Sequence, residues 1–195
     1  PDMVAQLKAK IDVAEHLGAK VVRHDVTWRR DLDWREIIAR TKDSVREVTE
    51  YAARKGIRTC TENHGYVMQD ANRVEELILA VNHPNYGWLV DMGNFLCADE
   101  PSMHALPIAA KYAFHAHAKD FLLKSEKPSD EWFPTRNGNF LRGTVVGHGV
   151  VPVRECVQTL RGAGYDGWLS LEFEGMEDNL PALRAGLSYL RAVTE

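Results

Sequence analysis

The sequence predicts an α/β fold built around a parallel sheet, and three observations support that prediction. Segments with helical periodicity alternate with short strand-like runs from one end of the chain to the other. Glycine follows several of the helical segments, as is typical of helix C-termini. Charged and polar residues gather where the strand-like runs finish. Strands separated by helices pair in parallel, because each helix carries the chain back to the same end of the sheet.

The first part of the chain shows one strand between two helices. An apolar stripe at helical spacing comes first, made of Val4, Leu7, Ile11 and Ala14. Gly18 follows where that helix would end, and the run 20–26 (KVVRHDV) predicts a strand. Asp33, with Glu36 three residues later, resembles a capping box and begins a helix that extends to about Arg54.

The middle of the chain continues the same alternation. Residues 57–65 (IRTCTENHG) predict the second strand and its loop, and residues 87–93 (GWLVDMG) predict the third strand. Between them lies a helix, shown by apolar residues at i, i+3, i+4 and i+7: Val74, Leu77, Ile78 and Val81. A helix near 102–111 precedes the fourth strand, 112–121 (YAFHAHAKDF).

The segment 122–147 is too long for an ordinary connection, and we interpret it as a functional loop or a mobile insertion. Its aromatic and basic residues suit a lid: Trp132, Phe133, Arg136, Phe140 and Arg142. Regular structure then resumes with a strand at 167–175 between two helices. Their apolar faces are Val153, Cys156, Val157 and Leu160 in one helix and Leu180, Leu183, Leu187 and Leu190 in the other.

Composition limits the classes of function. The chain has 195 residues, a formal net charge of −4 and no basic block, which argues against a nucleic-acid surface. Its apolar runs are shorter than the roughly 20 residues that a membrane span requires. Cys60, Cys97 and Cys156 form an odd, widely spaced set, typical of reduced cysteines in a cytoplasmic protein.

Four of the five predicted strands carry metal-ligand residue types near their carboxyl ends, where parallel α/β sheets bind ligands: Glu62, Asp91, His117 and Glu172. In the fourth strand His115, His117 and Lys119 share one face, because successive side chains alternate between faces. Each of these residues alone is more often paired or half-exposed than a ligand. Together, three buried carboxylates would repel one another, and a divalent cation would neutralise them.

This donor set is rich in oxygen. One imidazole with three carboxylates favours Mn²⁺, Mg²⁺ or Co²⁺, with Zn²⁺ as a further candidate. The sequence therefore predicts one divalent metal ion as the cofactor.

Several segments, in this order, resemble the xylose isomerase-like TIM barrel superfamily, the sugar phosphate isomerase/epimerase group: 17-LGAKVVR-23, 62-ENHG-65, 91-DMGN-94, 117-HAKD-120, 147-GHGVV-151 and 164-GYDGWLSLEFEG-175. The resemblance implies a (β/α) barrel in which Glu62, Asp91, His117 and Glu172 hold the metal. It also implies that Glu62 and Glu172 act as catalytic acid and base. The substrate-binding positions that it implies are His64, Asn94, His115 and Lys119.

The resemblance covers about five C-terminal βα units of the eight in the family barrel. We therefore expect residues 1–195 to form a single TIM-barrel-like domain that lacks the N-terminal units. Two open sheet edges would invite pairing, so we expect either a truncated product or a homo-oligomer.

The first functional hypothesis is a sugar isomerase or epimerase that acts on a small sugar or polyol ketone through a metal-stabilised enediolate. A second hypothesis is a metal-dependent dehydratase of a polyhydroxy ring ketone, of the inosose or dehydroshikimate type. A third is an inactive partial barrel that acts only in binding or oligomerisation. Endonuclease IV-like DNA cleavage is disfavoured, because the chain is acidic and its ligand set describes one metal.

Overall fold

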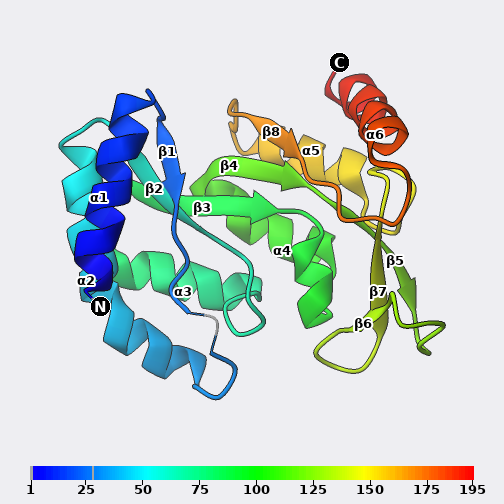
Figure 1. Cartoon of the computed structure of the whole chain (residues 1–195), viewed down its shortest axis with the longest axis horizontal. Helices are drawn as coiled ribbons and strands as arrows, with labels where there is room; N and C mark the ends of the chain where they lie inside the picture. The colour runs from blue at the N-terminus through cyan, green and yellow to red at the C-terminus, as the bar shows by residue number, and fades with distance from the viewer. Residues whose placement is uncertain (1, 28) are drawn as a thin grey trace.

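A curved parallel sheet forms the centre of the protein (Figure 1), which a computed structural model describes over residues 2–27 and 29–195. The strands are β1 (Val21–Arg23), β2 (Arg58–Glu62), β3 (Tyr86–Asp91), β4 (Ala113–Ala118), β5 (Asp120–Lys124), β6 (Phe133–Pro134), β7 (Phe140–Thr144) and β8 (Leu169–Leu171). The helices are α1 (Met3–His16), α2 (Trp34–Ala53), α3 (Ala71–Val81), α4 (Ser102–Ala109), α5 (Val153–Gly162) and α6 (Asn179–Thr194), with short 3₁₀ helices η1 (Asn94–Ala98) and η2 (Ala110–Tyr112).

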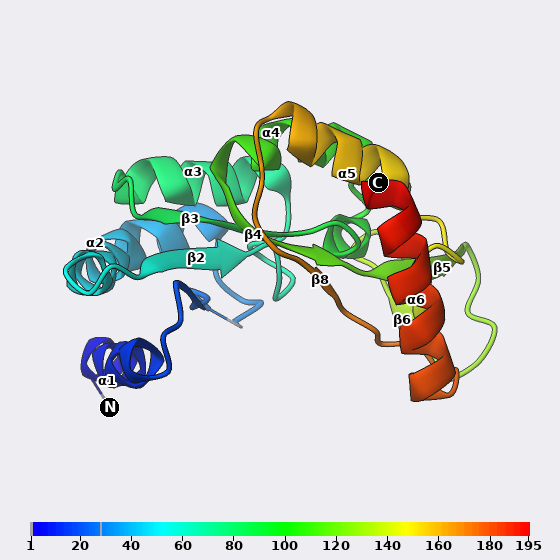
Figure 2. The same ribbon diagram turned by 90° about the horizontal axis from the view of Figure 1, so that it is seen from above.

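The central sheet is half of a barrel. Over the described residues it contains five strands in the order β1-β2-β3-β4-β8, and every neighbouring pair is parallel. Helices lie around its outer side, as the view from above shows (Figure 2). The predicted α/β fold of partial TIM-barrel type is therefore confirmed, with β1 and β8 at the two edges of the sheet.

Side-chain alternation separates the two faces of the sheet. The outward-pointing Trp88, Val90, Ala116 and Ala118 are fully buried in the main core with the helices. A smaller core joins α1 to α2 through Ile11, Val48, Ala52 and Ile57. The outer face is thus closed by apolar packing, which leaves the polar residues of the same strands on the inner face.

The predicted helices are present, with one difference at the start of α2. The Asp33 carboxylate caps α2 by accepting a hydrogen bond of 2.8 Å from the Arg35 backbone N–H. Glu36 does not complete a capping box, since it forms an ion pair with Arg40 one turn further along. No helix of residues 2–27 and 29–195 is both long and apolar enough to cross a membrane.

Three of the four leucines in the predicted stripe of α6 do not pack into the core. Leu180, Leu183 and Leu187 are exposed, and the buried face is made of Ala182, Gly186, Leu190 and Val193. Gly186 allows the close approach, because a Cβ atom at this position would lie 2.7 Å from Leu171 Cδ1. Helical periodicity predicted the helix but not which side of it packs.

The segment 122–147, interpreted from the sequence as a functional loop or a mobile insertion, contains regular structure that the sequence analysis did not predict. Parts of this segment, together with Asp120 and Phe121, form an antiparallel sheet in which β7 lies between β5 and β6. The strand 112–121 ends at Ala118 in the barrel sheet, and the chain then enters β5 of the second sheet. Trp132 is buried rather than presented as a lid residue, and the Arg142 guanidinium lies over its ring.

Asp99 fixes the tip of this second sheet to the barrel. Its carboxylate accepts hydrogen bonds from Thr135 Oγ1 (2.7 Å), Asn139 Nδ2 (2.8 Å) and the Asn137 backbone N–H (2.7 Å). Arg136 adds an ion pair with Asp70. The segment is therefore a fixed wall at the carboxyl ends of the strands.

We predict that Asp99→Ala will loosen this wall without unfolding the barrel. Loss of three hydrogen bonds of about 0.5–1.5 kcal/mol each should accelerate amide exchange in residues 133–140 by at least tenfold. Exchange in β2 should not change. Asp130→Ala, which removes an exposed pair with Lys127 in the same segment, is the control and should leave both regions unchanged. Equal exchange in the wild type and Asp99→Ala would show that the tip is held by other contacts.

Candidate metal centre

Four predicted ligand residues meet at the carboxyl ends of four neighbouring strands. Glu62 and Asp91 are the last residues of β2 and β3, His117 lies near the end of β4, and Glu172 directly follows β8. One ligand atom from each of these residues lies within 4.8 Å of the other three. Glu62 and Asp91 are buried, and His117 and Glu172 are partly exposed. The group therefore has a closed base and an accessible side.

Asp91 is held by its own turn. Its Oδ1 accepts hydrogen bonds of 2.8 Å from the backbone N–H groups of Gly93 and Asn94. Its Oδ2 is buried and has no hydrogen-bond partner among the residues described. An oriented, buried oxygen of this kind fits a metal ligand, because such an oxygen is costly to leave without a partner.

Asn63, which sequence analysis did not assign, fixes the backbone of Asp91. Its Oδ1 accepts from the Asp91 N–H and from Trp88 Nε1 (3.0 Å each), and its Nδ2 donates to the Asp91 carbonyl oxygen (2.9 Å). Asn63 points to the buried outer side, between two residues that point inward. The sequence did contain a sign of this role, because Asn63 is a polar residue at an outward position of the 62-ENH-64 motif, where apolar residues are expected.

Glu62 is held from two sides. Asn94 Nδ2 donates a hydrogen bond of 2.9 Å to Oε1, and the Arg23 guanidinium forms an ion pair with Oε2. Asp25 in turn holds Arg23 through a contact of 2.6 Å. Asp25 and Arg23 therefore hold Glu62, a predicted metal ligand, in position.

His117 lies at the centre of the carboxylates. Its Nδ1 is 3.1 Å from Glu172 Oε2, 3.7 Å from Glu62 Oε1 and 3.8 Å from Asp91 Oδ2. Burial opposes protonation, but hydrogen bonds to Glu172 and Glu62 outweigh it and raise the pKa of His117 to about 9. The hydrogen bond from His117 holds the pKa of Glu172 well below its ordinary value.

Asp91 behaves in the opposite way. Burial raises the pKa of Asp91 to about 7, against the opposing charge of Lys119. The charges of Glu62 and Glu172 add to the effect of burial. The proton is thus held more tightly on Asp91, the carboxylate that is most deeply buried beside the other two.

The four predicted substrate-binding residues have different surroundings. Lys119 is buried, and its Nζ lies 3.0 Å from Glu172 Oε2 and 3.3 Å from Glu174 Oε2. Asn94 contacts Glu62, as described above. His115 bonds Ser170 Oγ at 2.8 Å, and its ring lies edge-on to that of His117. His64 is not one of the four residues of the predicted metal centre; it lines a cavity of about 240 Å³.

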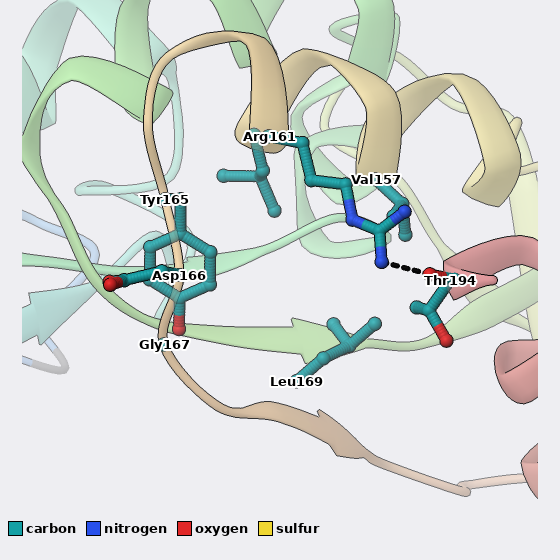
Figure 3. Close-up of a pocket in the computed structure, with 8 residues that line it drawn as sticks. Val157, Arg161, Tyr165, Asp166, Gly167, Leu169 and Thr194 are labelled. Carbon is teal, nitrogen blue, oxygen red and sulfur yellow. Dashed lines mark hydrogen bonds between the residues drawn. The ribbon is translucent and has the colours of Figure 1, made fainter.

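Another cavity, of about 260 Å³, lies at the opposite end of β8 (Figure 3). Tyr165, Asp166 and Gly167 precede β8 there, and Arg161 donates a hydrogen bond to the carbonyl oxygen of Thr194. None of the four predicted ligands lines this cavity. This cavity is therefore separate from the predicted metal centre.

Comparison with known proteins places the chain in a family. Residues 2–193 match the family described as xylose isomerase-like TIM barrel. The inosose dehydratase of Bacillus licheniformis is 28% identical over 147 residues, which are 74% of this chain and 48% of that protein. The chain therefore spans about half the length of this curated relative.

Solved structures show the same fold. A xylose isomerase domain protein from Planctomyces limnophilus has a TM-score of 0.74 at 26% identity, over 97% of this chain and 63% of that one. A xylose isomerase-like TIM barrel protein from Mycobacterium smegmatis, in complex with magnesium, has a TM-score of 0.77 at 20% identity, over 97% and 66%.

We predict that Mn²⁺ binding will strengthen as the pH rises. A metal competes with protons on Asp91 (pKa about 7) and His117 (pKa about 9), so its apparent affinity should increase through that range and then level off. Isothermal titration calorimetry in buffers of different ionisation enthalpy measures both the affinity and the protons released.

The control for this experiment is His104→Gln, which removes an exposed histidine outside the group and should leave the pH dependence unchanged. A dissociation constant for Mn²⁺ that does not vary with pH, with no proton release, would show that the metal does not displace protons from Asp91 and His117.

Proposed function

Because the chain belongs to the xylose isomerase-like TIM barrel family, we propose that it removes a proton beside the carbonyl group of a sugar or polyol ketone and returns it to give an isomer or epimer. The superfamily contains metal-dependent sugar isomerases and epimerases and inosose dehydratases. The observation that carries the proposal is the convergence of three carboxylates and one imidazole, with ligand atoms within 4.8 Å of one another.

The residues present fit one divalent cation. Glu62, Asp91, His117 and Glu172 would hold it, and the buried Asp91 Oδ2 supplies an oxygen that lacks a hydrogen bond among the described residues. When bound, the ion supplies Lewis-acid stabilisation of the negative charge that develops on adjacent substrate oxygens. The hard oxygen-rich donor set favours Mn²⁺, Mg²⁺ or Co²⁺, with Zn²⁺ as a further candidate.

Glu62 and Glu172 are suited to transfer protons because they reach the centre from β2 and from the end of β8, strands that lie on either side of β4 in the sheet. Glu172 remains ionised at neutral pH, since His117 and Lys119 stabilise its charge, so it can accept a proton. Arg23 and Asn94 hold Glu62 in one orientation. A positioned general acid or base contributes about 10²–10⁴-fold to the rate.

The polar residues around the centre would orient the substrate. His115 and His64 present imidazole groups that can hold hydroxyl groups. The Lys119 ammonium lies 3.0 Å from Glu172 Oε2, where it would stabilise negative charge on a substrate oxygen. Asn94 would act through Glu62, which it contacts directly.

Dehydration is the second candidate, and the curated relatives favour it. The chain matches inosose dehydratases at 26–28% identity over 68–80% of its length. The same proton removal would begin that reaction, and a hydroxyl group on the β carbon would then leave as water. The two candidate reactions therefore share the first step and diverge only after it.

We predict that Glu62→Gln and Glu172→Gln will each lower turnover of a ketone substrate by at least about 10²-fold at saturating Mn²⁺, because each removes a proton-transfer group. Turnover is measured by chromatography of the sugar products. Glu155→Gln, on the exposed side of α5, changes charge equally and should be fully active. Undiminished activity in either site variant contradicts the assigned roles.

We also predict that the chain with Mn²⁺ will exchange deuterium from heavy water into a ketohexose at the carbon beside the carbonyl, without loss of water. Nuclear magnetic resonance distinguishes the outcomes directly. Exchange accompanied by an epimeric product supports the first function. Loss of water from an inosose, with no exchange or epimer from the ketohexose, supports dehydration instead.

A further inference from the structure

A second cavity adjoins the predicted metal centre at the same end of the sheet. It measures about 240 Å³ and is lined from the loops after β1 and β2, from η1 and from β6. Its position is linked to the centre through η1, where Asn94 contacts Glu62 and Cys97, one turn later, lines the cavity. Burial raises the pKa of the Cys97 thiol, and the charge of Asp91 adds to that rise.

The walls of the cavity are rigid. Tyr66 has a positive φ of 74°, an uncommon conformation for a residue with a side chain. Its N–H donates to Gln69 Oε1 at 2.9 Å, and its carbonyl oxygen accepts from the Arg136 guanidinium. On the opposite wall Phe133 packs edge-on against the buried Phe121, with ring centroids 5.8 Å apart. Backbone strain that is held in this way is typical of binding sites.

Arg30 gives the cavity its charge. Its guanidinium lies over the Tyr66 ring at 4.6 Å, and no carboxylate pairs with it among the described residues. Other arginines around this end of the sheet have acidic partners: Arg23 with Asp25, Arg29 with Asp31, and Arg136 with Asp70. The part of the chain that the structure describes places no Asp or Glu in the lining of this cavity.

The two neighbouring sites therefore have opposite character. The metal end carries Glu62, Asp91 and Glu172, which would repel an anionic substituent placed beside them. The cavity offers the guanidinium of Arg30 above the Tyr66 ring, and Phe133 forms part of another wall. A substrate with a carbonyl group at one end and an anionic group at the other would be oriented by this difference alone.

We propose that this cavity is a subsite for an anionic group, a phosphate or a carboxylate, at the end of the substrate remote from the metal. Arg30 binds that group, while Tyr66 and Phe133 pack against the carbon chain or ring that connects it to the ketone. The proposal rests on the proposed function, because it assigns the other end of the same substrate. It narrows the substrate class to acidic sugar or polyol ketones.

Binding of three ketoses to the Mn²⁺-loaded chain tests this subsite: D-fructose, D-fructose 6-phosphate and D-fructuronate. A charge-assisted hydrogen bond from Arg30 should make one of the anionic ketoses bind about tenfold or more tightly than D-fructose. The stronger of the two anionic ketoses identifies phosphate or carboxylate as the preferred group. The measurement is isothermal titration calorimetry.

Arg30→Gln should reduce the affinity for that anionic ketose to the level of D-fructose, with Mn²⁺ affinity unchanged. Arg29→Gln is the matched control, since the neighbouring Arg29 is paired with Asp31, and it should keep the preference. Equal affinity for all three ketoses, no binding of any of them, or a preference that survives Arg30→Gln would overturn the subsite.

Deuterium exchange separates this proposal from the proposed function. Exchange into D-fructose without any anion preference rejects the subsite alone. An anion preference that depends on Arg30, without exchange into any of the three ketoses, supports the subsite and counts against the proton-transfer chemistry.

Discussion

The structure depends on the electrostatic cost of bringing Glu62, Asp91 and Glu172 together in a partly buried space. Burial alone would favour their protonated forms, and the raised pKa of Asp91 shows that tendency. Cationic side chains on the same inner face, above all Lys119 and His117, offset part of this cost. These contacts explain why β4, an inner strand of the sheet, carries so many polar residues. The remaining negative charge of the centre would still be stabilised by a bound divalent cation.

The backbone around this centre is fixed by side chains that never enter it. The Asp120 carboxylate accepts hydrogen bonds of 2.8–3.0 Å from four backbone N–H groups, those of Phe121, Gly147, Gly149 and Val151. A Cβ atom at position 149 would lie 2.2 Å from Asp120 Oδ1, so glycine is required for this contact. Two separate motifs, 117-HAKD-120 and 147-GHGVV-151, are thus parts of one arrangement that connects β4 to the chain after β7.

The second sheet changes how the site is bounded. A free lid would open and close over the centre, whereas β5, β6 and β7 are joined in an antiparallel sheet and attached to the barrel through Asp99. Gly143 forms a bridge with Gly175, which places this sheet against the segment that carries Glu172. The wall that contains Phe133 is therefore built into the fold. Substrate selection at this end would depend on the shape and charge of a preformed cavity.

Local patterns in the sequence determined the order of helices and strands, the parallel pairing and the strand ends at which Glu62, Asp91, His117 and Glu172 lie. The spacing of apolar residues in a helix and the alternation of side chains in a strand are local properties, so they can be recognised from neighbouring residues. Tertiary structure alone decided that β5, β6 and β7 form a second sheet and that Leu180, Leu183 and Leu187 of α6 are exposed. It also decided that Arg23 and Asn63 hold the centre in place. Those outcomes depend on contacts between residues that are distant in the sequence. Asp99 holds the second sheet, and Leu171 packs against Gly186 of α6. A local pattern carries no information about such contacts.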